Sequence, residues 1–207
     1  MPIALRLLLV CVLLLPFAAR ANFSQEISHR LAGGQPVAGH TLYAANLMQR
    51  MYQGNGQQPL WSDAAIEELL TAIDGLGGDG LTPADYRFPQ LDPLLRARVE
   101  GGISPAEAAE LDLLLTEAFA RAVYNLYFGK VDAERLDPNI NFARSMEGDD
   151  PAPALRQAIL GGAIAATFGE ARPKNVRHQW LKDALARYRQ YSTSPKVAGL
   201  RCPRARR

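Results

Sequence analysis

Apolar residues recur at helical spacing along most of the chain, and breaker residues divide the pattern into separate elements. The first apolar face consists of Leu42, Ala45, Leu47 and Met51. The helix that carries this face is expected to end at Gly54-Asn55-Gly56. Ser62 or Asp63 caps the next predicted helix, which ends at Asp74-Gly75 because glycine readily closes a helix. The apolar stripe of that second helix consists of Ile66, Leu69, Leu70 and Ile73.

The clearest start signal for a helix lies at Ser104-Pro105-Ala106-Glu107. It combines an N-cap serine, a proline at the first helical position and a glutamate at the third, which together make a capping box. The apolar pattern then continues to Phe128 and predicts one long helix. Its narrow polar face is formed by Glu110, Glu117, Arg121 and Asn125. Glu117 and Arg121 are spaced for an i,i+4 ion pair, and the wide apolar face places this helix in the middle of a bundle.

Shorter elements complete the predicted fold. Thr82-Pro83 opens a helical turn, residues 91–99 form a modest helix, and residues 130–150 have a loop-like composition. Two final helices are predicted at residues 153–160 and at about residues 174–191. The last helix is expected to dock on the bundle through one face, which carries Val176, Trp180, Ala184, Tyr188 and Tyr191. Because no segment shows sustained strand alternation, the sequence predicts an all-α fold, a single irregular helical bundle.

Residues 1–21 are predicted to be a signal peptide rather than part of the fold. Arg6 supplies the positive charge, residues 7–17 are almost entirely apolar, and Ala19 and Ala21 are the small residues expected before a cleavage site. The apolar run is shorter than the roughly 20 residues that span a bilayer, so a permanent transmembrane helix is the weaker interpretation. We therefore expect an exported, periplasmic protein that is cleaved near Ala21 and does not stay inserted in the membrane.

Cleavage leaves one predicted helical domain over residues 22–191, followed by a disordered basic tail over residues 192–207. Lipidation of Cys11 is an alternative to cleavage, but this cysteine lies inside the apolar run with more hydrophobic chain after it. Only Cys202 then remains in the mature chain, which excludes an intramolecular disulfide.

The charge of the chain is unevenly distributed. The whole sequence has a net charge of +2, whereas residues 22–191 carry 16 Lys and Arg against 21 Asp and Glu, a net charge of −5. The tail contributes a further five cations and no acid. Nucleic-acid binding by the body is disfavoured, because neutralising phosphates requires a clustered cationic face.

No catalytic, cofactor-binding or metal-binding residue is predicted. His29, His40 and His178 are far apart and lack the i,i+4 spacing of a helical zinc site, so we interpret them as surface or packing residues. The sequence contains no Gly-x-Ser-x-Gly or Ser-x-x-Lys motif that would supply a serine nucleophile. Cys202 lies in an arginine-rich tail without a histidine to act as its base, so we interpret it as an unstructured thiol.

Two further patterns imitate functional motifs. Gly75-Leu76-Gly77-Gly78-Asp79-Gly80 matches the dinucleotide fingerprint, but a helix rather than a strand is predicted before it, so we interpret it as a flexible turn. A glycosidase needs two carboxyl groups on either side of a cleft. The neighbouring acids of this chain are Glu67 with Glu68, Glu107 with Glu110, and Asp149 with Asp150. They lie on predicted exposed helix faces or in a loop, so we interpret them as solvated charges rather than as a glycosidase pair.

Several short motifs, taken in their order along the chain, resemble one protein family. They are Gln58-Pro59-Leu60-Trp61-Ser62-Asp63, Gly80-Leu81-Thr82-Pro83-Ala84-Asp85-Tyr86, residues 111–119, residues 127–132, Leu136-Asp137-Pro138 and residues 178–189. Over roughly residues 40–191 the chain resembles the N-terminal scaffold domain of the large periplasmic L,D-transpeptidases. In that family the scaffold precedes a catalytic domain, often together with a peptidoglycan-binding module. The catalytic domain cross-links peptidoglycan stem peptides through an acyl-enzyme on a cysteine in a Ser/Thr-His-Gly-Cys context.

The resemblance implies a helical, periplasmic chain. It also implies a non-catalytic one, because the Ser/Thr-His-Gly-Cys motif is absent from this sequence. Its expected role is structural, within a peptidoglycan cross-linking enzyme, with peptidoglycan or a cell-wall protein as partner. The arginine-rich ending, residues 200–207, resembles a truncated or frameshifted reading frame. Two alternatives stay open: an independent envelope module that binds peptidoglycan or a protein through its helical surface, and an enzyme whose scattered carboxylates converge in the fold.

Overall fold

The computed structural model describes residues 22–34, 36–131 and 150–192. Within these residues the regular structure is helical, and the β-type pairing consists of one isolated antiparallel bridge between Val37 and His40. The predicted all-α fold is confirmed. The predicted signal peptide lies outside the described residues, as do most of the predicted loop at residues 130–150 and the tail after Ser192.

The described helices follow the apolar pattern closely. In chain order they are residues 22–33, α2 (Ala45–Gln53), α3 (Asp63–Gly75), the 3-10 turns η1 (Leu76–Asp79) and η2 (Pro83–Asp85), α4 (Leu91–Val99), α5 (Pro105–Phe128), α7 (Ala152–Leu160), α8 (Ile164–Ala171) and α9 (Val176–Ser192). Ser62 is the residue that caps α3, because its side chain accepts a hydrogen bond from the N–H of Ala65. Ser192, which the sequence analysis assigned to the tail, is the last residue of α9.

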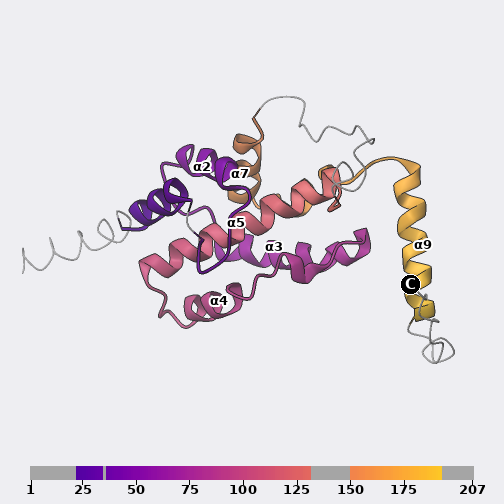
Figure 1. Ribbon diagram of the computed structural model, residues 1–207, viewed down its shortest axis with the longest axis horizontal. Helices are drawn as coiled ribbons and strands as arrows, with labels where there is room; N and C mark the ends of the chain where they lie inside the picture. The colour runs from indigo at the N-terminus through magenta and orange to yellow at the C-terminus, as the bar shows by residue number, and fades with distance from the viewer. Residues whose placement is uncertain (1–21, 35, 132–149, 193–207) are drawn as a thin grey trace, which may run out of the picture.

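Helix α5 forms the centre of the bundle. The predicted capping box is present, with Ser104 Oγ accepting from the N–H of Glu107 and the Glu107 carboxylate accepting from the N–H of Ser104 at 2.9 Å. Figure 1 shows α5 running through the middle of the fold, with α2 and α7 on one side and α3 and α4 on the other. Helices α2, α3, α4 and α8 all pack against it.

The hydrophobic core surrounds α5 and includes a cluster of three rings from three elements. Phe119 of α5 stacks on Phe168 of α8 with ring centroids 5.9 Å apart, and the edge of Trp61 meets Phe119 at 6.2 Å. Trp61 lies in the extended segment before α3 and is only 3% exposed. The Trp61 ring therefore fills space between the packed helices.

Helix α8 was not expected from the sequence. It has eight residues and begins at Ile164, shortly after Gly161-Gly162. Its N-cap residue, Ala163, provides no side-chain cap. Its buried residues Ile164, Phe168 and Ala171 do have helical spacing, but an apolar pattern this short is difficult to distinguish from a loop. Packing against α3 and α5 supplies the stabilisation that local signals lack.

The expectation that α9 docks through its aromatic face is wrong. Trp180 and Tyr188 are 62% and 73% exposed, and none of the residues of α9 is buried. Figure 1 shows α9 standing apart from the bundle. The helix contacts η1 through its opposite, polar side, where Lys182 and Arg189 bond to Asp79 and to the carbonyl of Gly77. Charge pairing, rather than apolar burial, thus determines which side of α9 faces the bundle.

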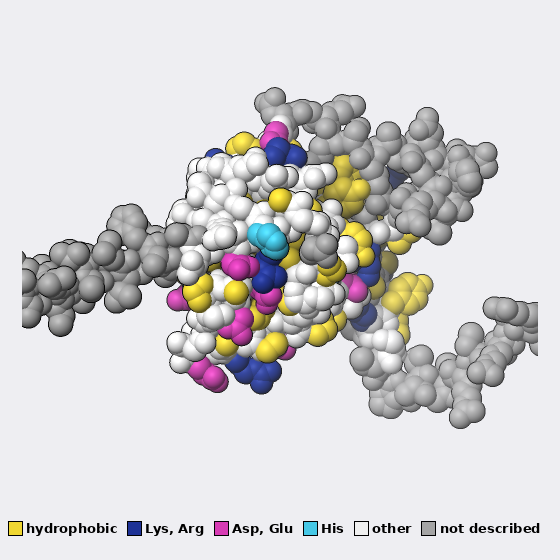
Figure 2. Space-filling model, turned by 60° about the vertical axis from the view of Figure 1, so that its left-hand side comes forward, with side chains coloured by type: hydrophobic (Ala, Val, Ile, Leu, Met, Phe, Trp, Pro, Cys, Tyr) yellow, Lys and Arg dark blue, Asp and Glu magenta, His cyan; other side chains and the backbone are white. Residues whose placement is uncertain are grey.

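The described surface mixes both signs of charge. On the face shown in Figure 2, acidic and basic side chains are interspersed with apolar ones. No helix of the described residues has the length and apolar character needed to cross a membrane.

Candidate functional site

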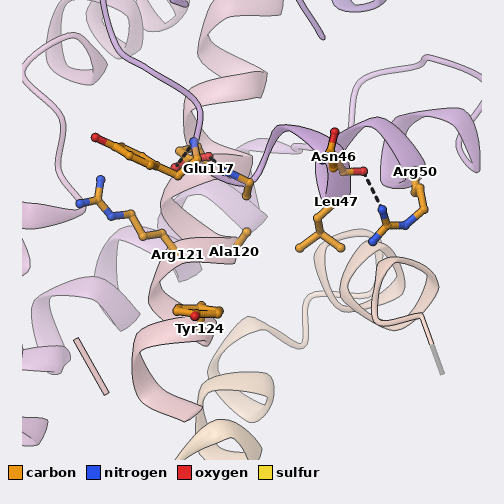
Figure 3. A pocket seen from close by; sticks show the side chains of 9 residues that line it. Asn46, Leu47, Arg50, Glu117, Ala120, Arg121 and Tyr124 are labelled. Atoms are coloured by element: carbon orange, nitrogen blue, oxygen red, sulfur yellow. Dashed lines mark hydrogen bonds between the residues drawn. The ribbon is translucent and has the colours of Figure 1, made fainter. Parts of the chain in front are cut away.

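A groove lies between α2 and α5 on the described surface. Its volume is about 460 Å³, within the range of roughly 300–1,000 Å³ that is typical of small-molecule sites. Figure 3 shows Glu117, Ala120, Arg121 and Tyr124 along α5, and Asn46, Leu47 and Arg50 along α2. Tyr43 and Ala44, which precede α2, complete the lining. The groove therefore combines apolar and aromatic surface with two guanidinium groups.

Glu117 holds the two walls of the groove together from within. Its side chain is fully buried, and its two oxygens accept the N–H groups of Tyr43 and Ala44 at 3.1 and 3.0 Å. Burial raises the pKa of Glu117, and the two hydrogen bonds and the charge of Arg121 oppose that rise. The predicted ion pair between Glu117 and Arg121 is not formed, because both carboxylate oxygens already accept backbone N–H groups.

Arg121 instead lies beside an aromatic ring. Its guanidinium carbon is 5.1 Å from the centre of the Tyr43 ring, a cation–π distance. In the described part of the chain this guanidinium has no hydrogen-bond acceptor and no ion-pair partner. Arg50, the other cation of the groove, donates to the Asp150 carboxylate at 2.9 Å and to the carbonyl of Asn46 at 3.0 Å.

A second buried carboxylate, Asp112, joins three segments beneath the groove. Asp112 Oδ1 accepts from Tyr52 Oη at 2.6 Å and from the N–H of Leu60 at 3.1 Å, while Oδ2 accepts from the N–H of Trp61 at 3.3 Å. Thr116, one turn further along α5, accepts from Trp61 Nε1 at 2.9 Å. The network ties α2 and the extended segment before α3 to the central helix.

The environment of Asp112 indicates a structural role. Burial raises the pKa of Asp112 to about 6, and hydrogen bonds from Tyr52, Leu60 and Trp61 act in the opposite direction. The side chain is only 3% exposed, and both of its oxygens are occupied by hydrogen bonds. A carboxylate without access to a substrate is not positioned for acid–base catalysis.

The glycine-rich segment at residues 75–80 positions a third acid, Asp79. It follows a helix and forms a 3-10 turn that ends at Gly80, whose φ of +82° lies in the left-handed region that favours glycine. Arg172 Nε and Lys182 Nζ contact the two Asp79 oxygens at 2.8 and 2.6 Å. Burial alone would raise the pKa of Asp79, but the two cations outweigh it and hold the pKa below its ordinary value. The interpretation of this segment as a turn, rather than a dinucleotide site, is supported.

The carboxylate pairs noted in the sequence have separate partners. Glu110 forms an ion pair with Arg30, Glu68 accepts the N–H of Ala165, and Glu107 belongs to the capping box. Asp150 accepts from Arg50 and from the N–H of Ala152, whereas Asp149 lies outside the described residues. Among the described members, no pair faces another across a cleft.

The three histidines also lie apart. His40 stacks on Phe88 with ring centroids 3.9 Å apart, and burial, followed by the charge of Arg121, lowers its pKa. His178 lies in the first turn of α9, while His29 lies on the N-terminal helical segment. No group of three or more metal-ligating residues comes together in the described residues. Cys202 lies outside them.

Sequence reasoning missed Asp112 and misplaced Glu117. Both acids lie on α5 among residues that are buried around the whole circumference of the helix over residues 111–120. The run Leu111-Asp112-Leu113-Leu114-Leu115 was the available signal, since an acid enclosed by leucines in a central helix has little access to solvent. Its hydrogen-bond partners lie more than 50 residues away in the chain, and the sequence does not identify them.

A family model described as a scaffold domain matches residues 46–185. The chain belongs to the scaffold-domain family. The match covers nearly all of α2, then α3 to α5, α7, α8 and most of α9. It includes Asp79, Asp112, Glu117 and the groove residues other than Tyr43 and Ala44. The comparisons with curated proteins and with solved structures each returned no match. The predicted scaffold domain is therefore confirmed, and the family supports a non-catalytic module.

Proposed function

We propose that this scaffold domain is the non-catalytic part of an exported L,D-transpeptidase that cross-links peptidoglycan in the periplasm. The family match over residues 46–185 carries the proposal. The ordered motifs of the sequence, from Gln58 to Arg189, point to the scaffold of this particular enzyme class. The predicted signal peptide at residues 1–21 is consistent with export.

The exposed face of α9 supports a role in holding another protein domain. Trp180, Leu181 and Tyr188 are 62%, 70% and 73% exposed, and Val176 and Tyr191 add to the same broad face. Arg177 and Arg187 lie among them at helical spacing. Aromatic residues and arginine are enriched where proteins bind each other, since they bury a large area and retain polar contacts. We propose that this face contacts the cysteine-bearing catalytic domain.

Site-specific photo-crosslinking in the native bacterium tests this function. A benzophenone side chain is introduced at Trp180, and in a control strain at Val99, which is 87% exposed at the end of α4. We expect the Trp180 probe to capture a protein that contains Ser/Thr-His-Gly-Cys, and the Val99 probe not to capture it. Absence of any such protein at Trp180, or equal capture from Val99, would contradict the proposal.

The rival function is an independent envelope module, which the groove between α2 and α5 favours. Such a module would bind purified peptidoglycan sacculi or another envelope protein without any catalytic partner. Co-sedimentation of the purified chain with sacculi, together with a negative crosslinking result at Trp180, would favour the module over the enzyme scaffold.

A further inference from the structure

Helix α9 meets the bundle along a stripe of its own surface. The members of this stripe recur at intervals of four, three and four positions, which places them on one side of the helix, and they are His178, Lys182, Leu185 and Arg189. Lys182 bonds to Asp79 of the η1 turn. Arg189 donates to the carbonyl of Gly77 in the same turn, and Leu185 lies beside the glycine that ends it. The stripe therefore docks α9 on η1.

Asp79 is the fixed end of this contact. Its side chain is only 3% exposed and lies 2.6 Å from Lys182 Nζ and 2.8 Å from Arg172 Nε. Arg172 is the residue that follows α8, so it does not belong to α9. If Lys182 withdraws, Asp79 keeps Arg172 as its partner, and no unpaired carboxylate is left buried. The Lys182 side chain is 30% exposed and therefore already has access to water.

Little else in the structure opposes the separation of α9 from the bundle. None of its residues is buried, so moving it away would expose little additional apolar surface. Its helical structure is supported locally, because Asn175 Oδ1 accepts from the N–H of His178 at 2.9 Å, and Gln179 donates to Asp183 one turn further on. The helix is therefore able to keep its shape when its contact with η1 is lost.

The connection to the bundle leaves α9 room to move. Residues 172–175 are non-helical and form a short link between α8 and α9. A cavity of about 450 Å³ lies where the start of α9 faces the end of α5, and Pro173, His178 and Tyr127 are among its lining residues. Incomplete packing at this point means that a change in the direction of α9 does not require the bundle to be repacked.

We propose that Asp79 is the positioning residue of α9. Its ion pair with Lys182 fixes the direction in which Trp180 and Tyr188 face, and opening of this pair frees α9 as a helical arm that moves about residues 172–175 while the bundle stays folded. A domain bound to the aromatic face would move with the arm. The proposal concerns the face that the proposed function assigns to a catalytic domain, but it holds whatever that face binds.

The test measures the distance between α9 and the bundle in the purified full chain. Spin labels are attached at Val99→Cys on α4 and Tyr188→Cys on α9, two exposed positions outside the ion pair, after Cys11 and Cys202 have been changed to serine. Double electron–electron resonance should give one narrow distance distribution for the otherwise unchanged chain. Because no partner is present, the result is independent of the crosslinking outcome.

Removal of either member of the ion pair should free the arm. We expect Lys182→Gln to raise the population at other distances about fivefold or more, as the loss of a partly buried ion pair would. Asp79→Asn should have the same effect from the other side of the pair. Lys182→Arg, which keeps the charge, should retain the narrow distribution.

The matched control is Arg187→Gln, which removes the same charge from an exposed position of α9 outside the stripe and should leave the distribution unchanged. Thermal melts followed by circular dichroism establish that the bundle of each variant is folded. The proposal is overturned if Lys182→Gln keeps the narrow distribution, if Arg187→Gln broadens it equally, or if the arm opens only in variants whose bundle has unfolded.

Discussion

Tyr52 donates a 2.6 Å hydrogen bond to Asp112, and both side chains are removed from solvent. The bond joins α2 to α5 across 60 residues of sequence. Burying the Asp112 carboxylate is unfavourable, because removal from water disfavours its charged form. This burial raises the pKa of Asp112 to about 6. The protonation of Asp112 therefore links the stability of the bundle to pH.

The direction of that linkage follows from the proton balance. Asp112 titrates at about 6 in the folded chain and near its ordinary value of 3.8 when unfolded, so between these values the folded state binds more protons. The free energy of unfolding should fall as the pH rises from about 4 to about 6, by on the order of 3 kcal/mol from this group. In Asp112→Asn this contribution to the fall should be absent. Urea titrations of the wild type and the variant between about pH 4 and pH 6 would measure the two free energies of unfolding. Parallel pH curves would refute the assignment.

Trp61 should be critical for folding. Its ring is 3% exposed, its Nε1 donates to Thr116 at 2.9 Å, and its edge contacts Phe119. Truncation of a buried tryptophan to alanine costs about 3–5 kcal/mol, a large share of a domain stability of roughly 5–15 kcal/mol. We expect Trp61→Ala to be largely unfolded or aggregated, as judged by circular dichroism and gel filtration. Trp180→Ala is the matched control, because the ring of Trp180 is 62% exposed, and its melting temperature should be unchanged.

Removal of α9 should leave the bundle folded. The helix buries none of its side chains, and its described contacts are mainly polar ones with the η1 turn. A chain ending at Pro173 would keep the ion pair between Arg172 and Asp79 and lose only Lys182 from that cluster. We expect a cooperative thermal melt with a midpoint lowered by about 2–4 °C, the shift that corresponds to roughly 1 kcal/mol. Loss of the cooperative transition would show that α9 is part of the stabilising core.

The purified chain should not react with a carbapenem, the reagent that traps the active-site cysteine of L,D-transpeptidases. The sequence lacks the Ser/Thr-His-Gly-Cys context, and its remaining thiol after signal cleavage, Cys202, has no neighbouring histidine in the sequence. Intact mass spectrometry after incubation should show the unmodified mass, and tetrapeptide muropeptides should be neither cross-linked nor hydrolysed. A stoichiometric adduct on Cys202 would contradict this expectation.

Export should yield a protein that begins at Asn22. The small residues Ala19 and Ala21 fit the positions that signal peptidase recognises, after an apolar run that is too short to span a bilayer. N-terminal sequencing of the chain from the periplasmic fraction would test the cleavage site. Recovery of the chain as a lipid-modified species that begins at Cys11 would favour the lipoprotein alternative instead.

The sequence determined the helices whose signals are local. Ser104 and Glu107 form a capping box across three residues, and Ser62 caps α3 by accepting the N–H of Ala65. Neither feature depends on the rest of the fold. The burial of Trp61 also follows from its local sequence, because a large apolar ring in a short extended segment between two helices is most stable when it packs between them. Helix α8 was not predicted, because its eight residues gain their stability from packing on α3 and α5 rather than from local signals.

Only the tertiary structure decided the environment of each charged residue. Glu110, Asp112 and Glu117 lie on the same helix, yet Glu110 pairs with Arg30 while Asp112 and Glu117 accept buried N–H groups from segments 51 to 74 residues away. Likewise, α9 presents its aromatic face to solvent because Lys182, on the opposite side, pairs with the buried Asp79. Apolar periodicity specifies which residues can be buried together, whereas the partner of a charge depends on which distant segments the packing brings within hydrogen-bond distance.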